Sequence, residues 1–227
     1  MTITLITGAN KGIGYETAKQ LVELGHTVYV GARDLERGEA AAAALGARFV
    51  QLDVTDEESV STALAAIDAA EGRLDVLVHN AGILETGLDG PSALRSFDTN
   101  AVGIVRVTEA ALPLLHRSAD PNVVTISSSA GSFWAVNNPE RVEFGLPLAL
   151  YSASKAAATM LTVQYAKAHP DIKFNALEPG PTATDMTAAF DIGRPVEESA
   201  RVVVRLATLD PAGPTGTFQD EAGHLPW

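Results

Sequence analysis

Short apolar runs alternate with longer amphipathic segments along this 227-residue chain. The first run, Thr2–Ile6, is β-branched and aliphatic and predicts a buried strand. Behind it, apolar positions recur at helical spacing from Ile13 to Leu24, which predicts a helix that stops at Gly25. The chain is therefore expected to open with a strand and a helix.

The same alternation continues to the end of the chain. Further strands are expected at His26–Gly31, Arg48–Asp53, Leu74–Val78, Val123–Ser127, Ile172–Leu177 and near Gly216–Gln219. Further helices are expected at Leu35–Leu45, Ser92–Leu115, Tyr151–Lys167 and Glu197–Leu209. One more helix is expected directly after a possible capping box at Thr55–Glu58. The stretch from Ser127 to about Pro147 is expected to be irregular. This order predicts an α/β fold, a doubly wound parallel sheet of the Rossmann type, with about seven strands and helices on both faces.

Composition narrows the class of protein. Hydrophobic residues make up 46% and charged residues 19%, which suits one globular domain over residues 1–227. Because there is no cysteine and the five histidines are scattered, we expect no disulfide and no catalytic metal. A net charge of −12 argues against nucleic acid as a partner. Since neither a signal peptide nor an apolar run of about 20 residues is present, we expect no membrane association and a cytoplasmic location.

The glycine-rich turn TGANKGIG, residues 7–14, lies between the first strand and the first helix. Its glycines let the backbone come close to a ligand. The helix N-terminus points free N–H groups and the positive end of the helix dipole toward a diphosphate. The spacing differs from the GxGxxG of other dinucleotide proteins, and a turn without a ligand is the alternative. The expected cofactor contacts here are Gly8, Asn10, Lys11, Gly12, Ile13 and Gly14.

Polar residues follow the next strands, where a doubly wound sheet binds ligands. Arg33 stands where a ribose contact is expected, and with Lys11 it favours NADP(H) through its 2′-phosphate; a solvated residue ahead of a helix is the alternative. Asp53 and Val54 are expected near the adenine, although a helix-entry aspartate would look the same. Asn80, Ala81 and Gly82 are expected to pass close to the cofactor, with a plain turn as the equal alternative.

Tyr151 and Lys155 share one helix face because they are four residues apart. Proton exchange near neutral pH requires lowering the tyrosine pKa by about three units, or roughly 4 kcal/mol. One cation at about 4 Å supplies roughly that much, so Lys155 is expected to account for most of the lowering of the Tyr151 pKa, and an oxidised nicotinamide ring for the rest. The serines that end the preceding strand, Ser127 to Ser129, offer a hydroxyl to polarise a carbonyl.

Together these segments resemble the short-chain dehydrogenase/reductase family, over nearly the whole chain. The matching segments are TGANKGIG at 7–14, Asp53, NAG at 80–82, Asn100, ISSSAG at 126–131, YSASK at 151–155 and PGPTAT at 179–184. The resemblance implies a catalytic group of Asn100, Ser128, Tyr151 and Lys155. It also implies contacts from Tyr151, Lys155, Pro179, Gly180, Thr182 and Thr184 to the cofactor.

Within that family, TGANKGIG and GARDLERG look like the NADP-dependent carbonyl reductases. The implied function is reduction of a ketone or aldehyde, or the reverse, on a small-molecule carbonyl or alcohol substrate. The alternatives are an NADP-binding sensor that acts through a protein partner, and a non-redox dehydratase or epimerase on the same fold.

The sequence departs from the family pattern in three places, and its ending is a separate feature. His79 replaces a more common asparagine, with little expected effect. The long interval from Ser128 to Tyr151 is expected to place Phe133, Trp134 and Phe144 against the substrate, with packing on another subunit or on its own domain as alternatives. The segment from Thr184 to Glu197 is short for a substrate lid. The apolar ending at Trp227 leaves docking on a second subunit, in a dimer or tetramer, open.

Overall fold

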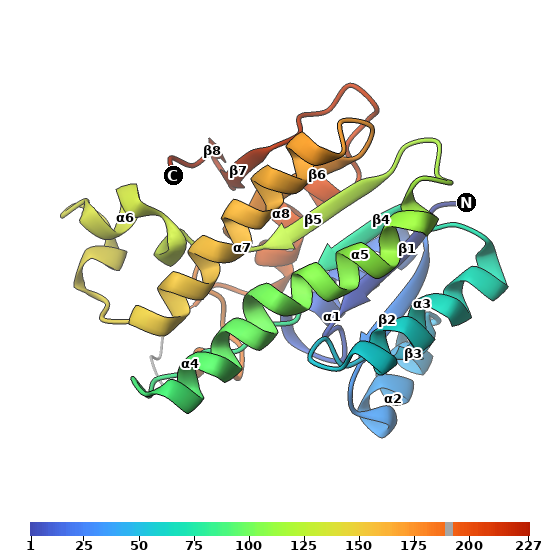
Figure 1. Cartoon of the computed structure of the whole chain (residues 1–227), viewed down its shortest axis with the longest axis horizontal. Helices are drawn as coiled ribbons and strands as arrows, with labels where there is room; N and C mark the ends of the chain where they lie inside the picture. Colours follow the sequence, from blue (N-terminus) through green and yellow to red (C-terminus); the bar gives the residue numbers. More distant parts are fainter. Residues whose placement is uncertain (189–192) are drawn as a thin grey trace.

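The computed structural model describes residues 1–188 and 193–227. One eight-stranded sheet runs through the molecule in the order β3-β2-β1-β4-β5-β6-β7-β8 (Figure 1). The strands are β1 (Ile3–Thr7), β2 (Thr27–Ala32), β3 (Arg48–Gln51), β4 (Val76–His79), β5 (Asn122–Ile126), β6 (Lys173–Leu177), β7 (Thr217–Asp220) and β8 (Gly223–His224). The doubly wound α/β prediction is confirmed. The sheet has one strand more than predicted, because the chain turns back after Asp220 and β8 pairs antiparallel with β7.

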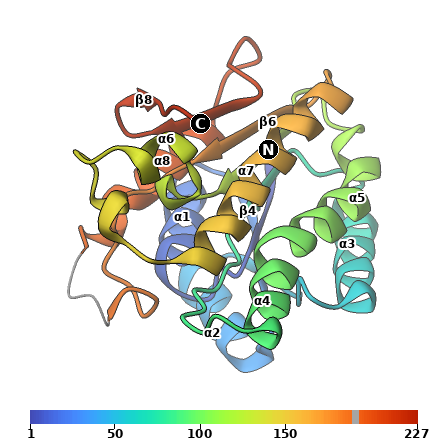
Figure 2. The same cartoon turned by 60° about the vertical axis from the view of Figure 1, so that its left-hand side comes forward.

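Helices cover both faces of this sheet (Figures 1 and 2). One core cluster joins the sheet to α3, α5 and α7, and the other joins it to α1, α2 and α8. The α-helices are α1 (Gly12–Glu23), α2 (Leu35–Leu45), α3 (Glu57–Glu71), α4 (Gly90–Phe97), α5 (Gly103–Leu115), α6 (Phe133–Asn137), α7 (Ala149–Ala168) and α8 (Val196–Ala207). Among residues 1–188 and 193–227, no helix has both the length and the apolar character needed to cross a membrane.

The central strand β4 shows why this pattern requires two helical layers. Its residue Leu77 belongs to the α3/α5 cluster, whereas Val76 and Val78 belong to the α1/α8 cluster. Because successive side chains of a strand point to opposite faces, each of these side chains needs an apolar partner on its own side. Burying a side chain of this size stabilises the fold by about 1.5–3 kcal/mol.

The predicted helix Ser92–Leu115 is divided into α4 and α5 by a π-helical turn, η1 (Asp98–Val102). The extra residue of a π turn is local and leaves no strong sequence signal. In the middle of η1, Asn100 is directed toward Ile83 and is buried. The interruption therefore falls on a residue that the sequence assigns to catalysis.

Two local expectations are corrected. The N-cap of α3 is Asp56, which accepts from the Ser59 amide at 2.8 Å, while Thr55 donates instead to Asp53. The stretch expected to be irregular contains the short helix α6, flanked by the 3₁₀ turns η2 (Ser129–Gly131) and η3 (Val142–Gly145). Ser132 caps α6 by accepting from the Ala135 amide at 3.0 Å.

Candidate active site

A cavity of about 810 Å³ opens at the carboxyl ends of the strands, where the strand order reverses between β1 and β4. Most of the residues predicted to contact a cofactor line it. They are Gly8, Asn10, Lys11, Gly12, Ile13, Arg33, Asp53, Val54, Asn80, Ala81, Gly82, Tyr151, Lys155, Pro179 and Thr184. The predicted residues outside the lining are Gly14, Asn100, Ser128, Gly180 and Thr182.

The glycine turn forms one end of the cavity. Gly8 has a φ of +64°, which favours glycine, and a Cβ there would lie 3.0 Å from the Cα of Ala81. A Cβ on Gly14 would lie 2.3 Å from Nδ2 of Asn80. Gly14 therefore permits close packing of α1 on the neighbouring turn.

The Asn80–Gly82 turn is fastened to the end of β1 by a small set of hydrogen bonds. Thr7 Oγ1 accepts from the amides of Asn80 and Ala81 at 3.1 and 3.0 Å. Asn80 Nδ2 donates to the carbonyls of Thr7 and Gly8 at 2.8 and 2.9 Å. These bonds hold the glycine turn and the Asn80–Gly82 turn at a fixed separation across the cavity.

Two cations of the lining stand at the glycine turn and at the end of β2. Arg33 is exposed, as a phosphate-binding guanidinium must be before its ligand arrives. Lys11 Nζ instead forms an ion pair with Asp185 at 2.7 Å, from the loop that follows β6. That carboxylate partly offsets the charge of Lys11, whereas Arg33 keeps its charge at the cavity edge.

Asp53 has the features expected of an aspartate at the start of a helix and also those expected of a residue that contacts the adenine. Its Oδ1 accepts from the amide and the hydroxyl of Thr55 at 2.9 and 2.7 Å, as a helix-entry aspartate would. The residue also lines the cavity. Both alternatives for Asp53 therefore stay open.

Tyr151 and Lys155 lie on the same face of α7, with the Lys155 Nζ 5.8 Å from the centroid of the Tyr151 ring. Lys155 is buried, and its Nζ donates to the Ile126 carbonyl at 2.8 Å. Burial lowers the pKa of Lys155 to about 8. The helical pairing predicted from the spacing is present.

The predicted effect of Lys155 on Tyr151 is wrong for this arrangement. The pKa of Tyr151 is raised, first by burial and then by the negative charge of Glu178, while a hydrogen bond with Ser128 lowers it. The lysine ammonium is directed at a backbone carbonyl, so desolvation dominates over its attraction for a phenolate. The Tyr151 phenol therefore stays protonated at neutral pH.

The three serines after β5 have different partners. Ser127 is buried, and its Oγ lies 2.6 Å from Thr159 Oγ1 and donates to the Lys155 carbonyl at 3.0 Å. Ser129 donates to the Glu143 carboxylate. Ser128 Oγ accepts from the Ala130 amide at 3.2 Å, and its hydroxyl also lies near enough to Tyr151 to lower the pKa of that phenol.

Asn100 lies beside Lys155 but uses its side chain to hold backbone. Its Oδ1 accepts from the Ile83 amide at 2.8 Å, and its Nδ2 donates to the Ile83 carbonyl and to Ser154 Oγ at 2.8 and 2.9 Å. A Cβ on Gly82 would lie 3.4 Å from Asn100 Oδ1 and 3.5 Å from Lys155 Nζ. Asn100 therefore positions the segment that faces the lysine.

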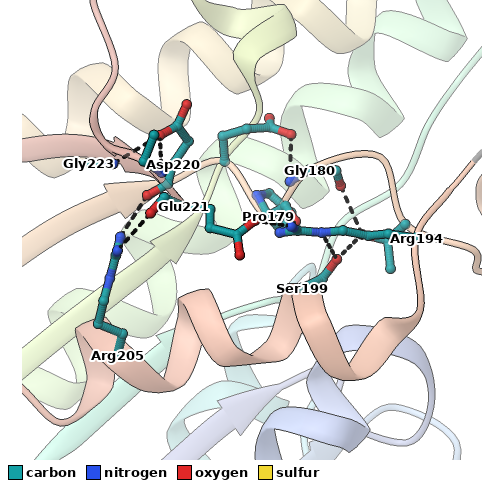
Figure 3. Close-up of polar contacts among 11 residues, drawn as sticks. Pro179, Gly180, Arg194, Ser199, Arg205, Asp220, Glu221 and Gly223 are labelled. Carbon is teal, nitrogen blue, oxygen red and sulfur yellow. Dashed lines mark hydrogen bonds and ion pairs between the residues drawn. The ribbon is translucent and has the colours of Figure 1, made fainter.

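The turn after β6 brings Pro179 and Thr184 to the cavity and places Gly180 and Thr182 behind them. Thr182 is buried, with its Oγ1 2.6 Å from Ser199 Oγ. Figure 3 shows Arg194 against this turn, where its Nη2 donates to the Pro179 carbonyl at 2.6 Å. Thr182 thus packs the loop on α8 rather than contacting the cavity. Residues 189–192 of the segment predicted as a short lid lie outside the described structure.

The predicted substrate wall is also corrected. The lining of the cavity contains no residue between Phe133 and Leu146. Instead α6 lies beside the C-terminal segment (Figures 1 and 2), and the Trp134 amide donates to the Trp227 carbonyl at 2.9 Å. Trp227 stacks on Phe218 of β7, so the C-terminal segment packs on the chain's own sheet, while Phe133, Trp134 and Phe144 stay exposed.

Comparison with known protein families shows which family this chain belongs to. The family model for short chain dehydrogenases matches residues 2–194. This protein belongs to the short-chain dehydrogenase/reductase family. The resemblance inferred from the motifs is confirmed, and the chain is an oxidoreductase of that family.

Relatives share this family over most of the chain. A short-chain dehydrogenase/reductase of Stachybotrys chlorohalonatus is 35% identical, covering 97% of this chain and 88% of the relative. Salutaridine reductase of Papaver bracteatum is 30% identical, covering 97% of this chain and 94% of the relative. The solved structure of NADPH-bound carbonyl reductase from chicken fatty liver superposes with a TM-score of 0.87, at 26% identity and over 100% of both chains.

Several lining residues of this short-chain dehydrogenase/reductase were not predicted. They are Leu52, Thr55, Ile83, Leu84, Thr99, Ile126, Ser127, Ala183, Asp185, Met186 and Val196. Ile83 and Leu84 directly follow the Asn80–Gly82 turn, and Asp185 and Met186 directly follow Thr184. Adjacency to a predicted motif was therefore the available signal for these residues, and Thr99 directly precedes the predicted Asn100 in η1.

Proposed function

We propose that this short-chain dehydrogenase/reductase uses NADPH to reduce the carbonyl of a small ketone or aldehyde, or catalyses the reverse reaction. The observation that carries the proposal is that Tyr151 and Lys155 line the same cavity as the glycine turn. A proton donor and a dinucleotide cradle within one cavity suit hydride transfer coupled to proton transfer.

The residues present fit a dinucleotide with a 2′-phosphate. The close approach at Gly8 and the N-terminus of α1 provide a cradle for the diphosphate. Arg33 would hold the 2′-phosphate, while Pro179 and Thr184 would face the nicotinamide end. When bound, the cofactor supplies the hydride.

Tyr151 is proposed to give its proton to the carbonyl oxygen, and Ser128 to hold that oxygen by a hydrogen bond. The raised pKa of Tyr151 keeps the phenol protonated, which suits reduction. Lys155, at the cavity wall, is proposed to hold the nicotinamide ribose. Asn100 is proposed to act through the Ile83 backbone that it binds on both sides.

The substrate would enter beside Tyr151, where Ile83, Leu84 and Met186 make an apolar wall. The test is oxidation of NADPH, and in parallel NADH, with a panel of small and bulky ketones and aldehydes. We expect NADPH-dependent reduction of at least one apolar carbonyl. Binding of NADPH without turnover of any carbonyl or alcohol would instead support a sensor, and chemistry without net oxidation of the cofactor would support a dehydratase or epimerase.

A further inference from the structure

A buried carboxylate, Glu178, ends strand β6 directly before Pro179. The residue is 9% exposed, and its own amide donates to the Gln219 carbonyl at 2.8 Å. Its Oε1 accepts from the Gly180 amide at 2.8 Å, and its Oε2 accepts from the Ser129 amide. Each oxygen of one carboxylate therefore binds a different turn of the site.

These two turns carry neighbouring parts of the proposed chemistry. Ser129 follows Ser128, the proposed carbonyl-binding serine, and Gly180 follows Pro179, which faces the nicotinamide end of the cavity. A carboxylate that binds two backbone amides restricts the movement of one turn relative to the other. The separation of Ser128 from the cofactor side of the cavity thus depends on the Glu178 side chain.

We propose that Glu178 is a positioning residue that ties the Ser128–Ser129 turn to the Pro179–Gly180 turn and so sets the alignment of the carbonyl oxygen with the cofactor. This inference rests on the proposed carbonyl reduction. Glu178 need not touch the substrate, since it acts through the two backbone amides.

The charge of Glu178 gives this role a second consequence. The titratable groups around it are Tyr151 and Lys155 of α7, Glu143 and Arg141 of the η3 region, and Arg194, Asp220 and Glu221, which line one cavity with it. Its negative charge raises the pKa of both Tyr151 and Lys155. Its own pKa is raised, because burial outweighs the two amide bonds that lower it. Removing the charge should therefore make Tyr151 more acidic.

Arg194 holds the same turn from its other side (Figure 3). A Cβ on Gly180 would lie 3.0 Å from the Nε of Arg194, and that Nε also donates to Ser199 Oγ at 3.1 Å. Glu178, Gly180 and Arg194 all line a second cavity of about 420 Å³. Because Arg194 remains when Glu178 is changed, a conservative variant of Glu178 should keep the fold.

The test is Glu178→Gln, which keeps the shape but replaces one accepting oxygen with an amide group. We expect NADPH affinity within about threefold of wild type, because the adenosine end is untouched. We expect kcat to fall by roughly 10- to 100-fold, the cost of misplacing the reacting groups. The high-pH midpoint of ketone reduction should move down by about half a pH unit or more. An unchanged kcat and an unchanged midpoint would overturn the inference.

Glu143→Gln is the matched control, because Glu143 is equally buried and accepts from the hydroxyl of the same Ser129. It should leave the midpoint in place, and a shift equal to that of Glu178→Gln would refute the specific role of Glu178. Glu178→Asp retains the charge with a shorter reach, so it should lower kcat without moving the midpoint. This second variant decides the matter if Glu178→Gln does not fold, and a wild-type kcat in Glu178→Asp would then overturn the inference.

Hydrogen exchange separates this inference from the proposed function. At least one of the amide protons of Ser129 and Gly180 should exchange about tenfold faster in Glu178→Gln than in wild type, whether or not any carbonyl is reduced, because glutamine keeps only one accepting oxygen. Unchanged hydrogen exchange at both amides would overturn the inference that Glu178 connects the two turns. Failure of the wild-type protein to reduce any carbonyl, with faster exchange in the variant, would overturn the proposed function alone.

Discussion

Opposing interactions act on the pKa of the Tyr151 hydroxyl group. Burial and the charge of Glu178 raise its pKa, whereas the hydrogen bond with Ser128 lowers it. Lys155 has a pKa of about 8, so burial weakens even the nearby cation. A phenol held protonated in this way suits a proton donor for reduction, provided that Ser128 also contacts the substrate oxygen.

Tyr151→Phe tests the donor directly, because it removes the hydroxyl and keeps the ring. We expect kcat for ketone reduction to fall by about 10²- to 10⁴-fold, the usual contribution of a positioned proton donor. The Kd of NADPH, measured by fluorescence titration, should change little. Tyr165→Phe is the control, because its hydroxyl donates to Glu109 at 2.7 Å outside the cavity lining. Substantial remaining turnover in Tyr151→Phe would rule the assignment out.

Arg33→Ala tests the choice of cofactor. Loss of one charge-assisted contact of about 1.5–3 kcal/mol should weaken NADPH binding by roughly 10- to 100-fold and leave NADH nearly unchanged. The comparison is a titration of both cofactors against Arg37→Ala, because Arg37 is equally exposed and pairs with Asp34 at 3.6 Å. Equal weakening of NADPH and NADH in Arg33→Ala would mean that Arg33 does not recognise the 2′-phosphate.

At the scale of elements, α6 illustrates how a segment between two catalytic motifs can have a structural role. It follows the turn that carries Ser128 and packs against η2 and η3, and the Trp134 amide also bonds the C-terminal segment. Ser132 connects α6 to that segment, because its Oγ accepts from the Ala135 amide and donates to the Pro226 carbonyl at 2.7 Å. We therefore expect α6 to affect stability rather than substrate choice.

Ser132→Ala removes both hydrogen bonds of that hydroxyl. We expect the free energy of unfolding, measured with urea, to fall by about 1–2 kcal/mol, through the lost helix cap and the unpaired Pro226 carbonyl. The ranking of ketones by kcat/KM should stay as in wild type. Ser61→Ala, at an exposed site on α3, should cost less than about 0.5 kcal/mol. A changed ketone ranking in Ser132→Ala would mean that α6 contributes to substrate choice.

At the scale of the whole molecule, one buried histidine links folding to pH. His79 at the end of β4 is buried, and its Nε2 lies 2.9 Å from Thr108 Oγ1. Burial lowers the pKa of His79 from its ordinary value of 6.5 to about 3. Below pH 6.5 the unfolded chain therefore binds a proton that the folded chain does not, so stability falls as the pH falls toward 3.

His79→Asn should remove this acid sensitivity. Between pH 7 and pH 5, the His79 contribution to the wild-type free energy of unfolding should fall by about 2 kcal/mol, at roughly 1.4 kcal/mol per pH unit. Urea unfolding of both proteins at both pH values gives the difference independently of the lost Thr108 contact. His116→Asn, at an exposed site, should behave like wild type. An equal pH dependence in His79→Asn and wild type would mean that His79 is protonated in the folded state.

The sequence by itself determined the alternating fold and most of the cofactor cavity. These follow from short-range rules, since apolar periodicity selects strand or helix and a glycine turn must stand where a strand meets a helix. The spacing of Tyr151 and Lys155 likewise determines that they share a helix face. The family was also recognisable from its motifs, as the match over residues 2–194 confirms.

Only the tertiary structure decided where side chains point and how strongly burial acts on them. The Ile126 carbonyl accepts from the Lys155 ammonium, and the charge of the buried Glu178 raises the pKa of Tyr151, although both interactions join residues far apart along the chain. The hydrogen bond from the Trp134 amide of α6 to the Trp227 carbonyl also joins residues remote in sequence. Desolvation and long-range hydrogen bonds depend on how distant segments pack together, so no local pattern of residues predicts them.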